Sequence, residues 1–269
     1  MLGAIIGDIV GSIYEFANIK TKDFELFQPE MERTDDSILC IATADWLLHG
    51  GDVSHYYSRY ALEYPYPMGG YGGMFKAWSS KVARQGIHEP YNSCGNGSAM
   101  RIAPVGWAFE TEREVLEAAK VSASCTHNHP EGIKGAQATA LCIFLARQGH
   151  TASDIRARIE RDFGYDLSMS VKELQRRYSW QGIDGKGDGG ICQDSVPQAI
   201  ICALQAKDFE DAIRNAISIG GDSDTIGCIA GGIAEALYGI PESIKERAWK
   251  YLDETEGRTV RSFIQKYSI

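Results

Sequence analysis

Residues 224–238 read DTIGCIAGGIAEALY, a stretch that is apolar nearly all round. A helix at the protein surface keeps one polar face, whereas a helix without a polar face must be enclosed by other elements. We therefore predict that this stretch forms a central, buried helix and that the rest of the chain packs around it.

A stripe of glycines marks the N-terminal segment, residues 2–16, which is also predicted to be helical. Gly3, Gly7 and Gly11 recur every four residues and so lie on one face of the helix. Glycine is unfavourable inside a helix, so three on one stripe predict that another backbone approaches this face very closely. Asp8 and Glu15 are seven residues apart and lie near each other on another face.

Helical patterns account for most of the remaining chain, and alternating strand patterns are nearly absent. A length of 269 residues fits one large domain. We predict an all-α fold in which residues 1–269 form a single globular multi-helix domain. The segment WQGIDGKGDGG, residues 180–190, is expected to be a flexible loop. Further helices are predicted over 34–49, 53–63, 75–84, 112–124, 132–148, 153–162, 170–178, 194–206, 208–219, 242–252 and 257–267, and a helix or turn is predicted near Ala99.

Composition and charge narrow the possible functions. The net charge of -9, without a Lys/Arg-rich run, argues against nucleic acid as a partner. No apolar run is long enough to span a membrane, and the N-terminus lacks the basic start of a signal peptide. The seven cysteines are scattered and form no CxxC pair, which indicates buried thiols in a reducing compartment. We expect a cytoplasmic protein, in which only Cys94 and Cys125 lie where a catalytic cysteine would be expected.

Two acidic clusters, TDD at residues 34–36 and DSDT at residues 222–225, each open a largely apolar helix. Helix capping explains either cluster alone, but a cap needs one side chain, and each cluster supplies two carboxylates and a hydroxyl. Mg²⁺ and Mn²⁺ prefer several oxygen ligands of this kind. The sequence therefore predicts a site for two divalent cations, with the candidate ligands Thr34, Asp35, Asp36, Asp222, Asp224 and Thr225.

Glycine-rich stretches at residues 69–73 and 95–97 each precede a predicted helix. Glycine lets backbone N–H groups converge on an anion, and a helix N-terminus adds its dipole, so a diphosphate would fit there. Tight turns without a ligand are the alternative. The loop THNHP, residues 126–130, holds two histidines, but a third zinc ligand at suitable spacing is not evident. His127 is predicted to touch a ligand, to brace a metal carboxylate or to bond to the backbone.

Five motifs occur in a fixed order along the chain, and their combination is more specific than any one of them. The set resembles the ADP-ribosylglycohydrolase family, which includes the dinitrogenase-reductase-activating glycohydrolase and the ADP-ribosyl-acceptor hydrolases. The resemblance implies an all-α fold with two Mg²⁺ or Mn²⁺ ions in a cleft. The motifs are GDIVGSIYE at 7–15, TDDS at 34–37, GNGSAMR at 95–101, THNHP at 126–130 and GGDSDT at 220–225.

The resemblance also implies an activity, namely metal-dependent hydrolysis of the glycosidic bond between ADP-ribose and an acceptor. The substrate would be an ADP-ribosylated protein or small molecule, and ADP-ribose would be the product ligand. Glu15 and Asp35 would be the catalytic carboxylates, and the two acidic clusters would hold the metals. The residues implied to line the substrate are Gly70, Tyr71, Gly72, Gly73, Ser93, Gly95, Asn96 and His127.

One segment departs from the family pattern. Arginine-specific members often carry an Asp-Ile-Gly-like sequence where residues 67–72 read PMGGYG. The missing acidic residue weakens the case for arginine as acceptor. It also makes Glu15 the stronger candidate for the catalytic carboxylate. Two other functions stay open. The chain could be an inactive ADP-ribose-binding or structural protein on the same fold, although its carboxylates are intact. It could also be another two-metal hydrolase such as a phosphoesterase, which would leave the glycine-rich stretches unexplained.

Overall fold

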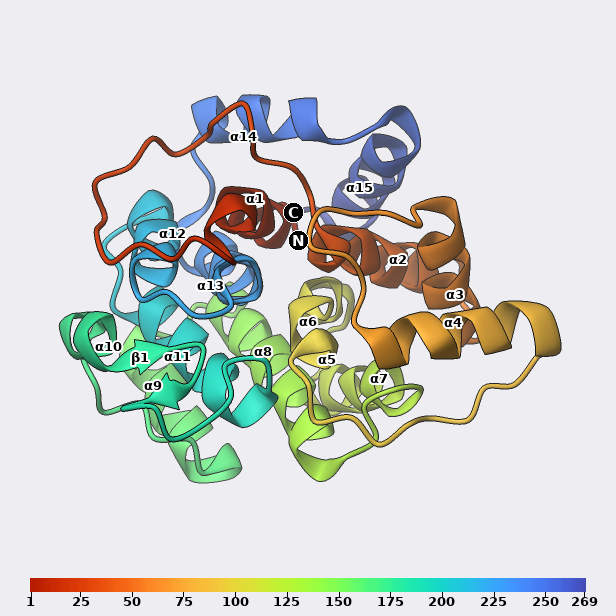
Figure 1. Ribbon diagram of the computed structural model, residues 1–269, viewed down its shortest axis with the longest axis horizontal. Coiled ribbons are helices and arrows are strands. Elements are labelled where there is room, and N and C mark those ends of the chain that lie inside the picture. Colours follow the sequence, from red (N-terminus) through yellow and green to blue (C-terminus); the bar gives the residue numbers. More distant parts are fainter.

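Helix α13, Ser223–Tyr238, lies at the centre of the structure, a computed structural model that describes residues 1–269 (Figure 1). Every residue from Ser223 to Glu235 is buried, which confirms the predicted central helix. It packs against α1 (Leu2–Gly11), α8 (Pro130–Arg147), α11 (Cys192–Leu204) and α12 (Phe209–Ser218). Buried apolar side chains from all of these helices belong to one cluster of 72 residues.

The contact between α1 and α13 is made by backbone rather than by side chains. A Cβ atom added to Gly7 would lie 1.9 Å from the carbonyl oxygen of Gly227, and one added to Gly3 would lie 2.3 Å from that of Gly231. The reverse substitutions meet the same obstacle, because a Cβ on Gly227 would lie 2.4 Å from the Gly7 oxygen. We call these four residues the glycine seam. It confirms the close approach predicted from the glycine stripe.

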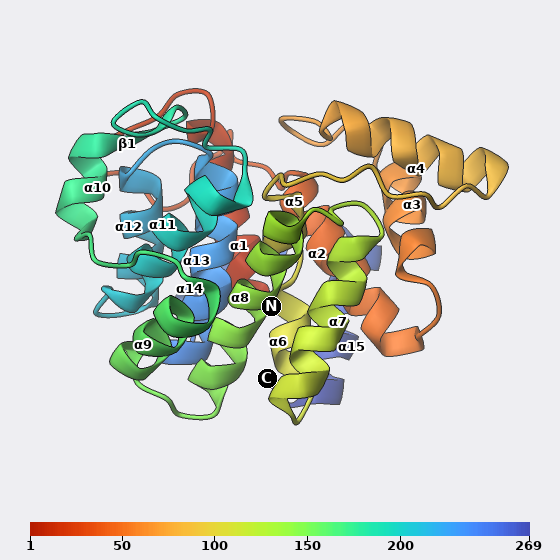
Figure 2. The same cartoon turned by 90° about the horizontal axis from the view of Figure 1, so that it is seen from below.

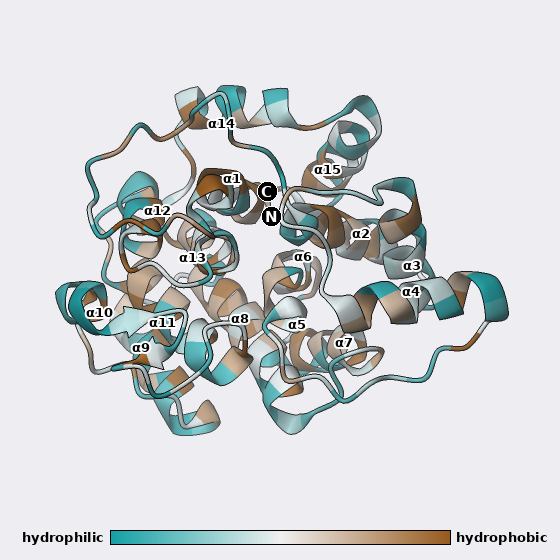
Figure 3. Cartoon of the chain, in the orientation of Figure 1, coloured by the Kyte–Doolittle hydropathy of each residue, from teal (hydrophilic) through white to brown (hydrophobic).

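The other elements flank this central pair on two sides (Figures 1 and 2). Helices α9 to α12 and the hairpin lie on one side, and α2 to α4 lie on the other. Apolar residues gather toward the interior, while outer helices such as α4 and α10 carry polar residues outward (Figure 3). The remaining helices are α2 Asp35–His49, α3 Val53–Glu63, α4 Gly73–Gln85, α5 Gly97–Met100, α6 Ala103–Ala108, α7 Glu112–Ser124, α9 Ala152–Phe163, α10 Val171–Arg177, α14 Glu242–Ala248 and α15 Glu254–Tyr267, with 3₁₀ helices at Ser12–Tyr14 and Trp249–Tyr251.

These helices confirm the all-α prediction, but two local predictions were wrong. The first helix ends at Gly11 rather than at residue 16 and continues as a 3₁₀ turn. The segment predicted as a flexible loop contains part of an antiparallel hairpin, β1 (Tyr178–Ser179) and β2 (Gly182–Ile183). Strands of two residues are too short for an alternating pattern to reveal them, and the turn depends on Gly182, with φ +71°.

All seven cysteines are free thiols, and five of them are buried. No helix is both long enough and apolar enough to cross a membrane.

Candidate active site and metal centre

A cleft of about 600 Å³ opens where the first residues of α2, α4, α5 and α13 come together. Every residue that the sequence analysis assigned to metal, catalysis or substrate lines this cleft, except Thr34. The acidic clusters and the glycine-rich stretches are far apart in sequence, but the fold places them in the same cleft.

The carboxylates in the cleft and directly behind it form two groups that share one residue. Oxygens of Asp8, Asp36 and Asp224 lie within 4.8 Å of one another, and so do oxygens of Glu15, Asp222 and Asp224. Because Asp224 belongs to both groups, it stands between two places where negative charge converges. Asp35 lines the cleft beside them without belonging to either group.

Asp8 is the one carboxylate of the set that is fully supplied with donors. It accepts hydrogen bonds from the backbone N–H groups of Thr34 and Ser37, each at 3.0 Å, and from both of their hydroxyls. Asp8 therefore fixes the start of α2 against α1. Thr34 is fully buried behind the cleft, where its hydroxyl donates to Asp8 at 2.6 Å and accepts from the N–H of Asp36.

Two carboxylate oxygens at the centre have no hydrogen-bond partner: Asp36 Oδ1 and Asp224 Oδ1, both buried. A buried charged oxygen without a partner is costly, and a bound cation would supply the missing interaction. Asp222 is held in place, since Asn96 Nδ2 donates to its Oδ2 at 2.7 Å. The donor set is made of oxygens only, which fits Mg²⁺ or Mn²⁺.

The pKa values of the carboxyl groups in the cleft also favour a bound cation. Burial, reinforced by the charge of neighbouring carboxylates, raises the pKa values of Asp35, Asp36 and Asp224 well above their ordinary range. Burial together with Asp224 and Asp8 raises the pKa of Glu15 to about 8, and burial is the main reason that the pKa of Asp222 rises to about 6. So many crowded carboxyl groups are stable as anions only beside a positive charge.

The glycine-rich stretch at residues 69–73 forms another wall of the cleft. Gly69 and Gly70 have φ values of +74° and +79°, which only glycine adopts readily. A Cβ on Gly69 would lie 2.8 Å from Glu15 Oε2, so the loop passes directly over that carboxylate. Helix α4 then begins without a side-chain cap, which leaves its first N–H groups available to an anion.

His127 also lines the cleft, and its ring is held by two residues. Thr126 Oγ1 lies 2.7 Å from His127 Nδ1, and Arg101 Nη2 donates to that same hydroxyl at 2.8 Å. Burial, with the charge of Arg101, holds the pKa of His127 well below its usual range, so the ring stays neutral. Its Nε2 atom faces the loop at Gly97, where an added Cβ would lie 3.0 Å away.

Several cleft residues were missed by the sequence analysis, among them Arg101, Trp180 and Tyr91. Arg101 is fully buried, stacks 4.0 Å from the centre of the Tyr57 ring, and carries Nε and Nη1 atoms without partners. The sequence signal that could have identified Arg101 is its position at the end of the GNGSAMR motif. Trp180 lies within the hairpin segment and donates from Nε1 to the backbone oxygen of Glu15 at 2.8 Å. Tyr91 also lines the cleft, and no sequence signal marks it.

The other candidate residues, two cysteines and a histidine, do not line the cleft. Neither Cys94 nor Cys125 lines the cleft. His129 is the N-cap of α8, where its ring accepts from the N–H of Glu131, and it shares no cluster of metal ligands with His127. The zinc alternative for this loop therefore finds no support in the geometry.

Comparison with known proteins gives relatives that extend over almost the whole chain. ADP-ribosylhydrolase ARH3 from Homo sapiens is 30% identical over 329 residues, covering 95% of this chain and 89% of the human protein. ADP-ribosylarginine hydrolase Tri1 from Pseudomonas putida (strain GB-1) is 26% identical, covering 93% of this chain and 73% of its own.

A solved structure of an ADP-ribosylglycohydrolase-related protein complex has the same fold. Its TM-score is 0.68 at 24% identity, and the similarity covers 98% of this chain and 96% of that one. The sequence profile of the ADP-ribosylglycohydrolase family matches residues 1–267. With the motifs in order and their residues gathered in one cleft, the chain belongs to the ADP-ribosylglycohydrolase family.

Proposed function

We propose that this protein hydrolyses the glycosidic bond between ADP-ribose and an acceptor, in a reaction that requires two divalent cations. The observation that carries the proposal is the pair of carboxylate groups sharing Asp224, placed in one cleft with an uncapped helix N-terminus. Relatives that cover nearly the whole chain are named ADP-ribosylhydrolases, which supports the same reaction.

The cleft offers separate places for the parts of ADP-ribose. The first N–H groups of α4 and the glycines at 70–73 suit the diphosphate, because backbone donors and the helix dipole both favour an anion. The distal ribose would then reach the carboxylates, bordered by His127, whose neutral ring can exchange a hydrogen bond with a hydroxyl. Ser93, Gly95 and Asn96 lie along the same wall.

Most of the carboxylates would serve as metal ligands in this proposal. Asp36, Asp222 and Asp224 would hold the cations, together with Asp35, Thr225 and the Thr34 hydroxyl. Bound Mg²⁺ or Mn²⁺ supplies Lewis acidity and lowers the pKa of water.

Two further groups complete the proposed machinery. Glu15, with its raised pKa, would hold or release a proton near the scissile bond, and Asp35 is the second candidate. As the bond breaks, positive charge develops at the anomeric carbon, and the surrounding carboxylates stabilise it. Asn96 keeps Asp222 oriented, and Trp180 holds the backbone of Glu15.

The function is tested by measuring free ADP-ribose released from arginine-linked and serine-linked peptides, with Mg²⁺ and with EDTA. We expect Mg²⁺-dependent release from one of the two, which would also identify the acceptor linkage. Binding of ADP-ribose without release from either peptide would favour a binding protein. Hydrolysis of simple phosphate esters, without binding of ADP-ribose, would favour the phosphoesterase alternative.

Replacing Glu15 by Gln should lower kcat at least about 100-fold, because proton transfer by a positioned side chain contributes that much or more. The substitution keeps the size of the side chain and removes a carboxyl group that is costly to ionise, so thermal stability should hold. Glu30→Gln, at an exposed position, is the matched control. A kcat equal to that of the unmodified protein would remove Glu15 from the mechanism.

The stabilisation that Mg²⁺ gives should grow from pH 6 to pH 8. Carboxyl groups with raised pKa values bind more protons in the native state than in the unfolded chain, so the cation-free protein loses stability as pH rises. Mg²⁺ binds the ionised groups and removes that loss. Thermal midpoints in Mg²⁺ and in EDTA should therefore differ more at pH 8. An equal difference at both pH values would show that protons and Mg²⁺ do not compete.

A further inference from the structure

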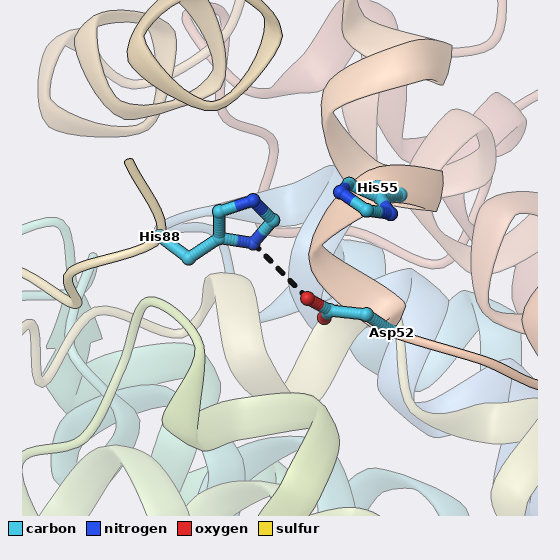
Figure 4. Close-up of side chains that lie close together, drawn as sticks. All are labelled: Asp52, His55 and His88. Carbon is cyan, nitrogen blue, oxygen red and sulfur yellow. Dashed lines mark ion pairs between the residues drawn. The ribbon is translucent and has the colours of Figure 1, made fainter. Parts of the chain in front are cut away.

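A second group of candidate metal ligands lies outside the cleft, at the start of α3. Asp52 is the N-cap of this helix and His55 lies three residues later, so both side chains project from its first turn. His88 reaches them from the segment that follows α4 (Figure 4). One ligand atom from each residue lies within 4.8 Å of the others. We propose that Asp52, His55 and His88 bind a transition-metal ion of the Zn²⁺ class.

The chemistry of this group differs from that of the cleft. The cleft offers carboxylate oxygens, which suit hard ions such as Mg²⁺, whereas two imidazole nitrogens and one carboxylate suit Zn²⁺ and related ions. The two sites should therefore select different metals. Three protein ligands leave one coordination position of a tetrahedral Zn²⁺ for water. Asp52 and His55 are exposed and also line a pocket of about 320 Å³, so water can reach both of these ligands.

The spacing is close to what a tetrahedral ion needs. With metal–ligand bonds of about 2.0–2.2 Å, neighbouring ligand atoms stand roughly 3.3–3.5 Å apart. His88 Nδ1 is 3.1 Å from Asp52 Oδ2, so this pair needs almost no adjustment. His55 offers a nitrogen within 4.8 Å of a ligand atom of each of the other two residues, and this exposed side chain would have to move closer to share the ion.

The contacts of the His88 ring give independent support for a bound metal ion. Its Nδ1 atom is hidden from solvent and, although close to Asp52, has no partner in hydrogen-bond geometry. Its ring meets that of His55 edge to face, with centroids 4.8 Å apart. An ion pair with an aromatic contact explains the proximity but leaves the Nδ1 atom unsatisfied, whereas a shared ion would satisfy it.

A metal at this position would act on the wall of the cleft. His88 belongs to the segment 86–92, which leaves the end of α4 and leads to Tyr91 and Ser93, both of which line the cleft. The ion would tie this segment to α3. Binding of Zn²⁺ should therefore slow hydrogen exchange of the amides in 86–92.

The test is calorimetric titration of the untagged protein with Zn²⁺ while Mg²⁺ saturates the cleft. We expect one equivalent of Zn²⁺ to bind, and His88→Ala to weaken that binding at least about tenfold. Asp52→Asn keeps the helix cap and should weaken it as well. His150→Ala, an exposed histidine elsewhere on the surface, is the control and should bind like the unmodified protein.

Two results would overturn the proposal. One is the absence of Zn²⁺ binding in the presence of Mg²⁺. The other is equal affinity in the unmodified protein and in His88→Ala, which would assign the bound ion to another site. Exchange in segment 86–92 provides the structural readout, and slowing that persists in His88→Ala would also count against the site. None of these measurements requires ADP-ribose hydrolysis, so they test the Zn²⁺ site independently of the proposed function.

Discussion

Asp224→Asn should abolish cation binding and lower the release of ADP-ribose by more than about 1000-fold. Asp224 is the only residue common to both carboxylate groups, so one substitution weakens both cation positions at once. Metal ions stabilise the charge of a transition state by several kcal/mol, and each 1.36 kcal/mol corresponds to a factor of about ten in rate. Calorimetric titration with Mg²⁺ and the peptide assay measure the two losses.

The same substitution should stabilise the protein in EDTA. Burial and the neighbouring carboxylates raise the pKa of Asp224, so above the ordinary pKa of aspartate its carboxyl group opposes folding in the absence of a cation, either as a buried charge or by taking up a proton. We expect a higher thermal midpoint in EDTA and little further gain from Mg²⁺. Asp23→Asn, an exposed control, should change neither value. An active, Mg²⁺-responsive Asp224→Asn protein would contradict the two-cation site.

Gly7→Ala should destabilise the fold by at least about 3 kcal/mol, at the upper end of what overpacking costs. The new methyl group would lie 1.9 Å from the carbonyl oxygen of Gly227, and that oxygen belongs to a buried helix backbone that cannot turn aside. The helices would have to separate, and the core around α13 would lose its packing. Denaturant unfolding of the purified variant gives the free energy.

The matched control for that loss is Gly73→Ala. This residue also lies in a helix, but nothing stands within 4 Å of the position of its missing Cβ. Because alanine favours helix over glycine, stability should be unchanged or slightly higher. If Gly7→Ala unfolded at the same denaturant concentration as Gly73→Ala, the glycine seam would not be the contact on which the fold depends.

Much of the helical structure could be predicted because its ends carry local signals. The predicted helix 53–63 agrees with α3, where the Asp52 side chain accepts from the N–H of Ser54. The predicted helix 112–124 agrees with α7, which starts with a capping box between Thr111 and Glu114. The helix α6 was missed, since its short sequence, APVGWA, contains Pro104 and Gly106 and shows no apolar period.

The candidate site was predictable to the extent that its residues form motifs. TDD and DSDT open helices, and the structure brings both to one cleft. The sharing of Asp224 between two groups could not be predicted, because it depends on how α2 and α13 are placed relative to each other. Arg101 and Trp180 were missed for a related reason: their contacts are with residues distant in sequence, at Thr126 and Glu15.

The glycine seam also affects folding during synthesis, because its two helices are translated at different times. Helix α1 is translated before its partner α13, which begins only at Ser223. At 5–20 residues per second, roughly 10–45 s pass before that partner has been translated. During this interval the apolar surface of α1 has no native neighbour, so the nascent chain is a natural client for chaperones. A ribosome that stalls before Ser223 would leave a chain unable to complete its core.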